Sequence, residues 1–132
     1  MDIFCKIVNG EIPSYKVYED DVCLAFLDIN PVTIGHTVLI CKEHYSDVVD
    51  ANPEVSMHMF DVAKKLANRA INKLNAKGVN ILTNCKEAAG QTVPHFHIHI
   101  IPRYDETDGY NPIFTAKENV DFEAVLKEFK ED

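Results

Sequence analysis

Half of the six histidines in this chain fall within one five-residue stretch, at alternating positions. In a β-strand, side chains two residues apart project from the same face. His95, His97 and His99 would therefore share one face, and the apolar residues between them, Phe96 and Ile98, would lie on the other. The pattern predicts a strand with one side in the core and a row of imidazoles on the opposite side.

A row of imidazoles supports two kinds of chemistry. Two histidines spaced His-x-His can hold a zinc ion, and a third can complete an open catalytic site. Alternatively, one neutral imidazole can attack phosphorus while a neighbour donates to phosphate oxygens or moves a proton. The preceding Gly90, Gln91, Thr92 and Val93 suit a phosphate, because glycine permits close approach to the backbone and N–H groups can surround an anion. The spacing alone leaves both possibilities open.

The elements that must position this row follow from periodicity and from helix-start signals. Asn52 followed by Pro53 is typical of a helix start, and apolar residues then recur every three to four positions as far as Leu74. A short helix is predicted after Asp2, and another in the tail between 119 and 130. Strands are predicted at 16–19, 22–28, 36–41, 79–85 and from 93 or 95 to 101. This order predicts an α+β fold with a mainly antiparallel sheet.

The composition, 46% hydrophobic and 26% charged, is typical of one globular domain, which we expect to span residues 1–132. The net charge of −8 and the lack of a basic tract argue against nucleic acid as a partner. We expect a cytoplasmic protein without membrane contact, because the sequence shows no signal-like N-terminus and no apolar run near the roughly 18 residues that cross a bilayer.

The segment 90–101 resembles the signature of the histidine triad (HIT) family, in which three histidines alternate with apolar residues on a strand. Residues 3–13, 23–31 and 35–44 resemble further blocks of that family, in the same order. The resemblance covers about residues 3–104 and is greatest to the Hint-like branch of nucleoside phosphoramidate hydrolases. It implies a HIT-like fold with a five-stranded antiparallel sheet, one long helix and short terminal helices. It also implies a homodimer whose two sheets join into a continuous ten-stranded sheet.

The resemblance implies roles for individual residues. His97 would be the nucleophile and form a nucleotidyl-histidine intermediate that water then cleaves, while His99 and Thr92 would contact the phosphate. The other catalytic positions that it implies are His95, Gln91 and His36. Asp28 would accept hydrogen bonds from the ribose hydroxyls. The further nucleotide-binding positions that it implies are Asn84, Val93, Ile7, Phe26, Ile29 and Phe4.

Some members of the family hold a structural zinc ion with two cysteines spaced C-x-x-C and two histidines. Cys5, His44 and His95 match three of these ligands, but Asp2 stands where the other cysteine would be. With the cysteine pair incomplete, we expect no zinc and no other cofactor.

The resemblance thus implies a purine nucleotide-binding hydrolase that cleaves nucleoside 5′-phosphoramidates, of the AMP-lysine or AMP-NH2 type, or related nucleotidyl compounds. The same triad fits a dinucleoside polyphosphate hydrolase acting on AppppA or ApppA, and a nucleotide-binding scaffold with incidental catalysis. A metal-dependent hydrolase that uses the histidines as ligands is a separate alternative. Within the domain, residues 1–104 would form the core and 105–132 a variable C-terminal tail with a helix.

Overall fold

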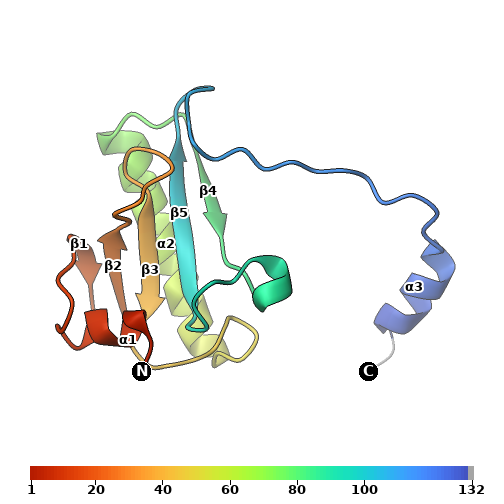
Figure 1. Cartoon of the computed structure of the whole chain (residues 1–132), viewed down its shortest axis with the longest axis horizontal. Coiled ribbons are helices and arrows are strands. Elements are labelled where there is room, and N and C mark those ends of the chain that lie inside the picture. Colours follow the sequence, from red (N-terminus) through yellow and green to blue (C-terminus); the bar gives the residue numbers. More distant parts are fainter. Residues whose placement is uncertain (131–132) are drawn as a thin grey trace.

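The computed structural model describes residues 1–130, which form one five-stranded sheet with three α-helices (Figure 1). Along the chain the elements are α1 (Ile3–Val8), β1 (Lys16–Glu19), β2 (Cys23–Leu27), β3 (Thr37–Cys41), α2 (Pro53–Lys73), β4 (Gly78–Leu82), the 3-10 helix η1 (Glu87–Ala89), β5 (His97–Arg103) and α3 (Phe122–Lys130). The sheet order is β1-β2-β3-β5-β4, and every neighbouring pair is antiparallel. The predicted α+β class is confirmed, with the long helix and both short terminal helices in the expected order.

Polar side chains fix where α1 and α2 begin. The Asp2 carboxylate accepts a hydrogen bond from the Cys5 backbone N–H at 2.8 Å, and the Asn52 side chain accepts one from the Glu54 N–H at 3.0 Å. Each bond satisfies an N–H group that the first helical turn leaves without an intrahelical partner. Pro53 occupies the first turn of α2, where its missing N–H costs no hydrogen bond.

The sheet separates two hydrophobic layers, because successive residues of a strand point to opposite faces. Ile98 and Ile100 of β5 pack in the cluster formed with α2, whereas Phe26 of β2 packs in the cluster formed with α1. His97 and His99 alternate with these isoleucines, so they lie on the α1 face of the sheet. The predicted division of β5 into an apolar and an imidazole-bearing side is therefore present.

The fifth strand begins later than predicted, at His97. His95 lies in a preceding turn, where its N–H donates to the Val93 carbonyl at 2.8 Å. Pro94 has no N–H to offer a neighbouring strand, so the ladder cannot extend back through this position. β4 is also shorter than the predicted 79–85, and the loop that follows it contains η1, which the sequence pattern does not predict.

The C-terminal arm (residues 111–130) leaves the sheet and carries α3 away from it (Figure 1). Just before the arm, the chain is tied to the core by the Gly109 N–H, which donates to the Val32 carbonyl at 2.7 Å, and by Arg103, whose Nε donates to Asp108 at 3.0 Å. The large apolar side chains of the arm are exposed: Ile113, Phe114, Phe122, Val125, Leu126 and Phe129. Within residues 1–130, no helix is long and apolar enough to span a bilayer.

Candidate active site

A pocket of about 280 Å³ opens on the α1 face of the sheet. It brings together eight of the predicted site residues, which come from α1, β2, β5 and the loops beside them: Phe4, Ile7, Phe26, Asp28, Ile29, Thr92, His97 and His99. Four of these side chains are apolar, and the other four can donate or accept hydrogen bonds. The pocket therefore offers an apolar surface for a flat ring next to polar groups suited to ribose and phosphate.

His97 is held in one tautomer by the backbone beside it. Its Nδ1 lies 2.6 Å from the His95 carbonyl, which can only accept, so Nδ1 carries the proton and Nε2 has a free lone pair. The side chain is buried, and this burial lowers the pKa of His97 below its usual value. At neutral pH the ring is therefore uncharged and presents an unprotonated nitrogen, as a nucleophile requires.

His36 and His99 form a relay with a defined direction. The Val32 N–H donates to His36 Nδ1 at 3.3 Å, so the His36 proton must be on Nε2. That Nε2 lies 3.0 Å from His99 Nδ1, which accepts and leaves the His99 proton on its own Nε2. Burial, together with the nearby His97 and His36, lowers the pKa of His99 to about 4. His99 is thus a neutral hydrogen-bond donor beside the neutral acceptor His97, with the two ring centroids 5.1 Å apart.

Asp28 lies at the end of β2 and is joined to this relay. Its Oδ1 accepts from the Asn30 N–H at 2.8 Å, and its Oδ2 lies 3.7 Å from His36 Nε2. The side chain is one-quarter exposed and lines the pocket. A carboxylate has enough lone pairs to accept from both hydroxyls of a ribose while it keeps its bond to the Asn30 backbone.

Hydrogen bonds of the Gln91 side chain stabilise the loop that precedes the triad. Its Oε1 accepts from the Lys86 N–H at 2.9 Å, and its Nε2 donates to the Ser46 carbonyl at 2.6 Å. Gly90 adopts a φ of +95°, a conformation that favours glycine. Thr92 is left exposed at the end of this loop, where its hydroxyl lines the pocket.

Two predicted binding residues lie near the pocket rather than in its lining. The Asn84 amide lies beside Gly90, 3.7 Å from the position that a Cβ atom there would occupy. The Val93 carbonyl accepts from the His95 N–H. Among the residues described, neither side chain lines the pocket, so Asn84 and Val93 can act on a ligand there only from the surrounding loop.

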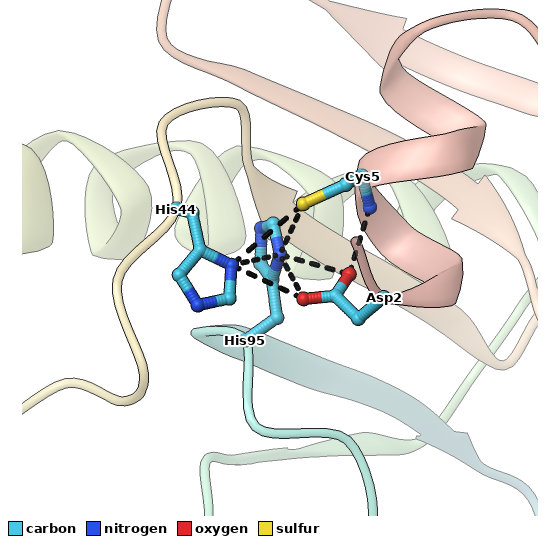
Figure 2. A group of neighbouring side chains, drawn as sticks. All are labelled: Asp2, Cys5, His44 and His95. Atoms are coloured by element: carbon cyan, nitrogen blue, oxygen red, sulfur yellow. Dashed lines mark hydrogen bonds and ion pairs between the residues drawn. The ribbon is translucent and has the colours of Figure 1, made fainter.

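His95 does not line the pocket, and its side chain lies in a separate cluster with Asp2, Cys5 and His44 (Figure 2). It is fully buried, and its Nε2 donates to the Cys41 carbonyl at 2.6 Å, which leaves Nδ1 unprotonated. Nδ1 lies 3.1 Å from an Asp2 oxygen, 3.5 Å from Cys5 Sγ and 3.3 Å from His44 Nδ1. His95 therefore contacts His97 through its backbone carbonyl, whereas its side chain belongs to a different cluster.

This Asp2–Cys5–His44–His95 cluster has the donor set of a zinc site. One ligand atom from each residue lies within 4.8 Å of all the others. A carboxylate, a thiolate and two imidazoles are all ligands that Zn²⁺ accepts in a tetrahedral site. The unprotonated His95 Nδ1 and the Asp2 carboxylate are both acceptors, and they face each other with no proton between them. A cation bound between the two would remove this repulsion. The four residues fit a metal ion that has no open position for a substrate.

Sequence reasoning did not single out a second cleft, of about 640 Å³, which adjoins the pocket at Thr92. Its charged side chains are Asp47, Lys86 and Glu87. Lys86 Nζ lies 2.8 Å from Asp47, which is almost completely buried. These residues are separated along the chain and match no motif, so only the folded arrangement of the two loops reveals them.

The fold and this arrangement of histidines are those of one family. The model of the HIT domain matches residues 9–106, so the chain belongs to the HIT family, in its Hint-like branch. An uncharacterised HIT-like protein of Methanocaldococcus jannaschii is 48% identical over 130 residues, covering 98% of this chain and 99% of that protein. The adenylylsulfatase HINT3 of Arabidopsis thaliana is 43% identical over 76% of this chain and 51% of its own length.

Solved structures support the same family assignment. A HIT family protein from Bacillus anthracis matches with a TM-score of 0.88 and 46% identity, covering 96% of this chain and 91% of that one. A histidine triad nucleotide-binding protein from Candida albicans matches with a TM-score of 0.83 and 34% identity over 98% and 93%. A Zn-bound histidine triad family protein from Mycobacterium smegmatis matches with a TM-score of 0.76 and 43% identity over 79% and 76%.

Proposed function

We propose that this protein is a nucleotide-binding hydrolase that cleaves purine nucleoside 5′-phosphoramidates through His97. The observation that carries the proposal is the pair of fixed tautomers in the pocket. His97 presents an unprotonated Nε2, and His99 presents an N–H donor beside it. A nucleophile and a phosphate-oxygen donor are the two groups that nucleotidyl transfer requires at the phosphorus atom.

In the first step, His97 Nε2 attacks the phosphorus and the bond from phosphorus to the leaving nitrogen breaks. The leaving nitrogen takes up a proton from solvent water and departs as an amine, while the nucleotide stays attached to His97. In the second step, a water molecule attacks the same phosphorus, loses a proton that returns to solvent and releases AMP with a free imidazole. His99 and the Thr92 hydroxyl donate to the phosphate oxygens, and Asp28 holds the ribose.

The relatives support this class of reaction. The Candida albicans protein is named as a nucleotide-binding protein, and the Arabidopsis thaliana protein as an adenylylsulfatase. An adenylylsulfatase cleaves a bond to an adenylyl phosphorus, as the proposed reaction does, although the leaving group differs. A hydrolase of dinucleoside polyphosphates is the second candidate, because it needs the same nucleophile and the same phosphate donors.

We further propose that the protein is a homodimer in which β4 strands of two subunits join the sheets. β4 is an edge strand, so its outer backbone groups are free to pair with another strand. Ile81 on β4 and Phe60 and Ile71 on the neighbouring α2 are partly exposed apolar side chains. A symmetric contact would cover them and extend the sheet.

We also propose that the Asp2–Cys5–His44–His95 cluster holds a structural metal ion, contrary to the expectation drawn from the missing second cysteine. The Asp2 carboxylate supplies the fourth ligand in its place. A zinc ion there would cross-link α1 to the turn before β5 and take no part in the reaction itself.

The nucleophile is tested with His97→Ala. We expect hydrolysis of an adenosine phosphoramidate to fall by at least about a thousandfold, while AMP binding by calorimetry is retained. Rapid-quench mass spectrometry of the wild type should detect a nucleotide attached to His97. His58→Ala, on the opposite side of the sheet, serves as the matched histidine control and should keep full activity. Unchanged turnover in His97→Ala would eliminate the mechanism, and a metal-dependent hydrolase would form no such intermediate.

A further inference from the structure

The second cleft adjoins the nucleotide pocket. It shares Thr92 with the nucleotide pocket, so a phosphate at Thr92 would stand between the two spaces. In phosphoryl transfer the attacking and leaving atoms lie roughly in line, on opposite sides of phosphorus. For a phosphate bound at Thr92 and attacked by His97 from the pocket side, a leaving group opposite His97 would extend past Thr92 toward this cleft.

The cleft contains a buried carboxylate at its base. Asp47 is only 1% exposed, and its Oδ1 accepts from the Asp50 N–H at 3.0 Å. Within the described chain, its Oδ2 has one charged neighbour, the Lys86 ammonium at 2.8 Å, and no other hydrogen-bond donor. The Lys86 side chain is itself 70% exposed, so this single partner can move toward solvent or toward a ligand.

The backbone of Lys86 shows that this partner is held in place at a cost. Lys86 has a φ of +77°, a region that side-chain-bearing residues rarely adopt. Such a conformation persists where the surroundings enforce it. Here the Gln91 side chain accepts from the Lys86 N–H, so the loop that presents Thr92 also fixes the backbone from which the Lys86 side chain reaches Asp47.

The charge of the cleft is negative. Lys86 and Asp47 neutralise each other, and Glu87 at the same rim has no ion pair among the described residues. The chain as a whole carries −8. A sulfate or a polyphosphate leaving here would meet uncompensated carboxylate charge, whereas an amine that carries a second ammonium group would be attracted.

We propose that this cleft is the leaving-group subsite, and that Asp47, Lys86 and Glu87 select amine leaving groups that are cationic or neutral against anionic ones. This inference rests on the proposed phosphoramidate hydrolysis and specifies its substrate class. It also separates the two candidate functions, because dinucleoside polyphosphates have strongly anionic leaving groups.

The test uses three adenosine 5′-phosphoramidates of similar length, made with propylamine, 1,3-diaminopropane and β-alanine. In the wild type, kcat/KM should be about twofold to fivefold higher for the diaminopropane compound than for the propylamine compound, and lower by a similar factor for the β-alanine compound. High salt should shrink both differences, because the charges are near the surface. A steric preference would not respond to salt.

Two variants assign the selectivity to the cleft. Glu87→Lys should reverse the order of the charged compounds, and Lys86→Gly should increase the preference for diaminopropane by leaving Asp47 without its cation. Asp61→Lys on α2 makes the same charge change as Glu87→Lys on the far side of the sheet, and should leave the order unaltered.

The outcomes distinguish this inference from the proposed function. If the propylamine compound is not hydrolysed at all, the proposed function fails. If it is hydrolysed but the three compounds react equally in the wild type and in Glu87→Lys, the leaving-group subsite is wrong and the hydrolase assignment stands. Preferential cleavage of diadenosine tetraphosphate would also overturn the inference.

Discussion

The three triad histidines differ in what their two nitrogens do. The Nδ1–H of His97 donates a hydrogen bond to a backbone carbonyl, whereas Nδ1 of His99 accepts one from His36. The Nε2–H of His95 donates to another carbonyl, and its side chain lies in the cluster with Asp2, Cys5 and His44. One ring therefore presents a free lone pair to the pocket, as the proposed nucleophile requires, one presents an N–H donor, and one is a candidate metal ligand. The alternating sequence predicts a shared face, but it holds no information on these tautomers. They depend on carbonyls and on His36, which only the folded sheet brings near.

The low pKa of His99 predicts how stability depends on pH. In the unfolded chain a histidine titrates near about 6.5, whereas folding lowers the pKa of His99 to about 4. Between these values the unfolded chain binds a proton that folded His99 does not, so the free energy of unfolding falls as the pH drops through this window. Urea denaturation between pH 7 and about 4.5 should show this decline, and it should be shallower in His99→Asn. Parallel declines in the two proteins would show that His99 is not its source.

At the level of elements, α1 connects the nucleotide pocket to the Asp2–Cys5–His44–His95 cluster. Phe4 and Ile7 line the pocket, while Asp2 and Cys5 at the start of the same helix face His95. A helix of six residues is far shorter than the roughly 12 that an isolated helix needs, so its contacts must hold it in place. The sequence predicts this helix and its cap. It does not predict that the residue in place of a cysteine still reaches the cluster, because that depends on where the turn before β5 places His95.

The cluster predicts one tight metal site that depends on Asp2. Asp2→Asn is the informative variant, because asparagine caps a helix as well as aspartate but removes the charged ligand. We expect the wild type to bind about one equivalent of zinc, and the variant to bind it at least about tenfold more weakly. Metal analysis after dialysis and amide hydrogen exchange of α1 measure this, since bound zinc should slow exchange in α1. Absence of zinc binding by the wild type would instead support the expectation drawn from the incomplete cysteine pair.

At the level of the whole molecule, the C-terminal arm carries an amphipathic helix that packs against no other element within residues 1–130. Phe122 and Phe129 on α3 are 78% and 86% exposed, and Figure 1 shows α3 well separated from the sheet. Residues 1–104 make up about four-fifths of the chain, so the 96% match to the Bacillus anthracis protein extends into the arm. The apolar periodicity predicts the helix, but its separation from the core cannot be predicted from it, because the same pattern would suit packing on the sheet.

This exposed face predicts a contribution of α3 to subunit association. A second copy of the chain is the partner that we expect to cover it, in line with the proposed dimer. Replacing Phe122 and Phe129 together by serine should raise the dissociation constant of the dimer by at least about tenfold. Sedimentation equilibrium or light scattering over a concentration series measures this change. Glu128→Ser on the same helix should leave association unaltered. A wild type that is monomeric at all concentrations, or a double variant that associates normally, would contradict this role.

The separation of the arm also has a consequence for how the molecule can be altered. The Mycobacterium smegmatis protein matches 79% of this chain, and the Bacillus anthracis protein matches 96%. Because residues 111–130 lie away from the triad and the sheet beneath it, a change in this part of the arm displaces no residue of the pocket (Figure 1). The architecture is modular, since the reaction centre and the appendage can be altered independently of each other.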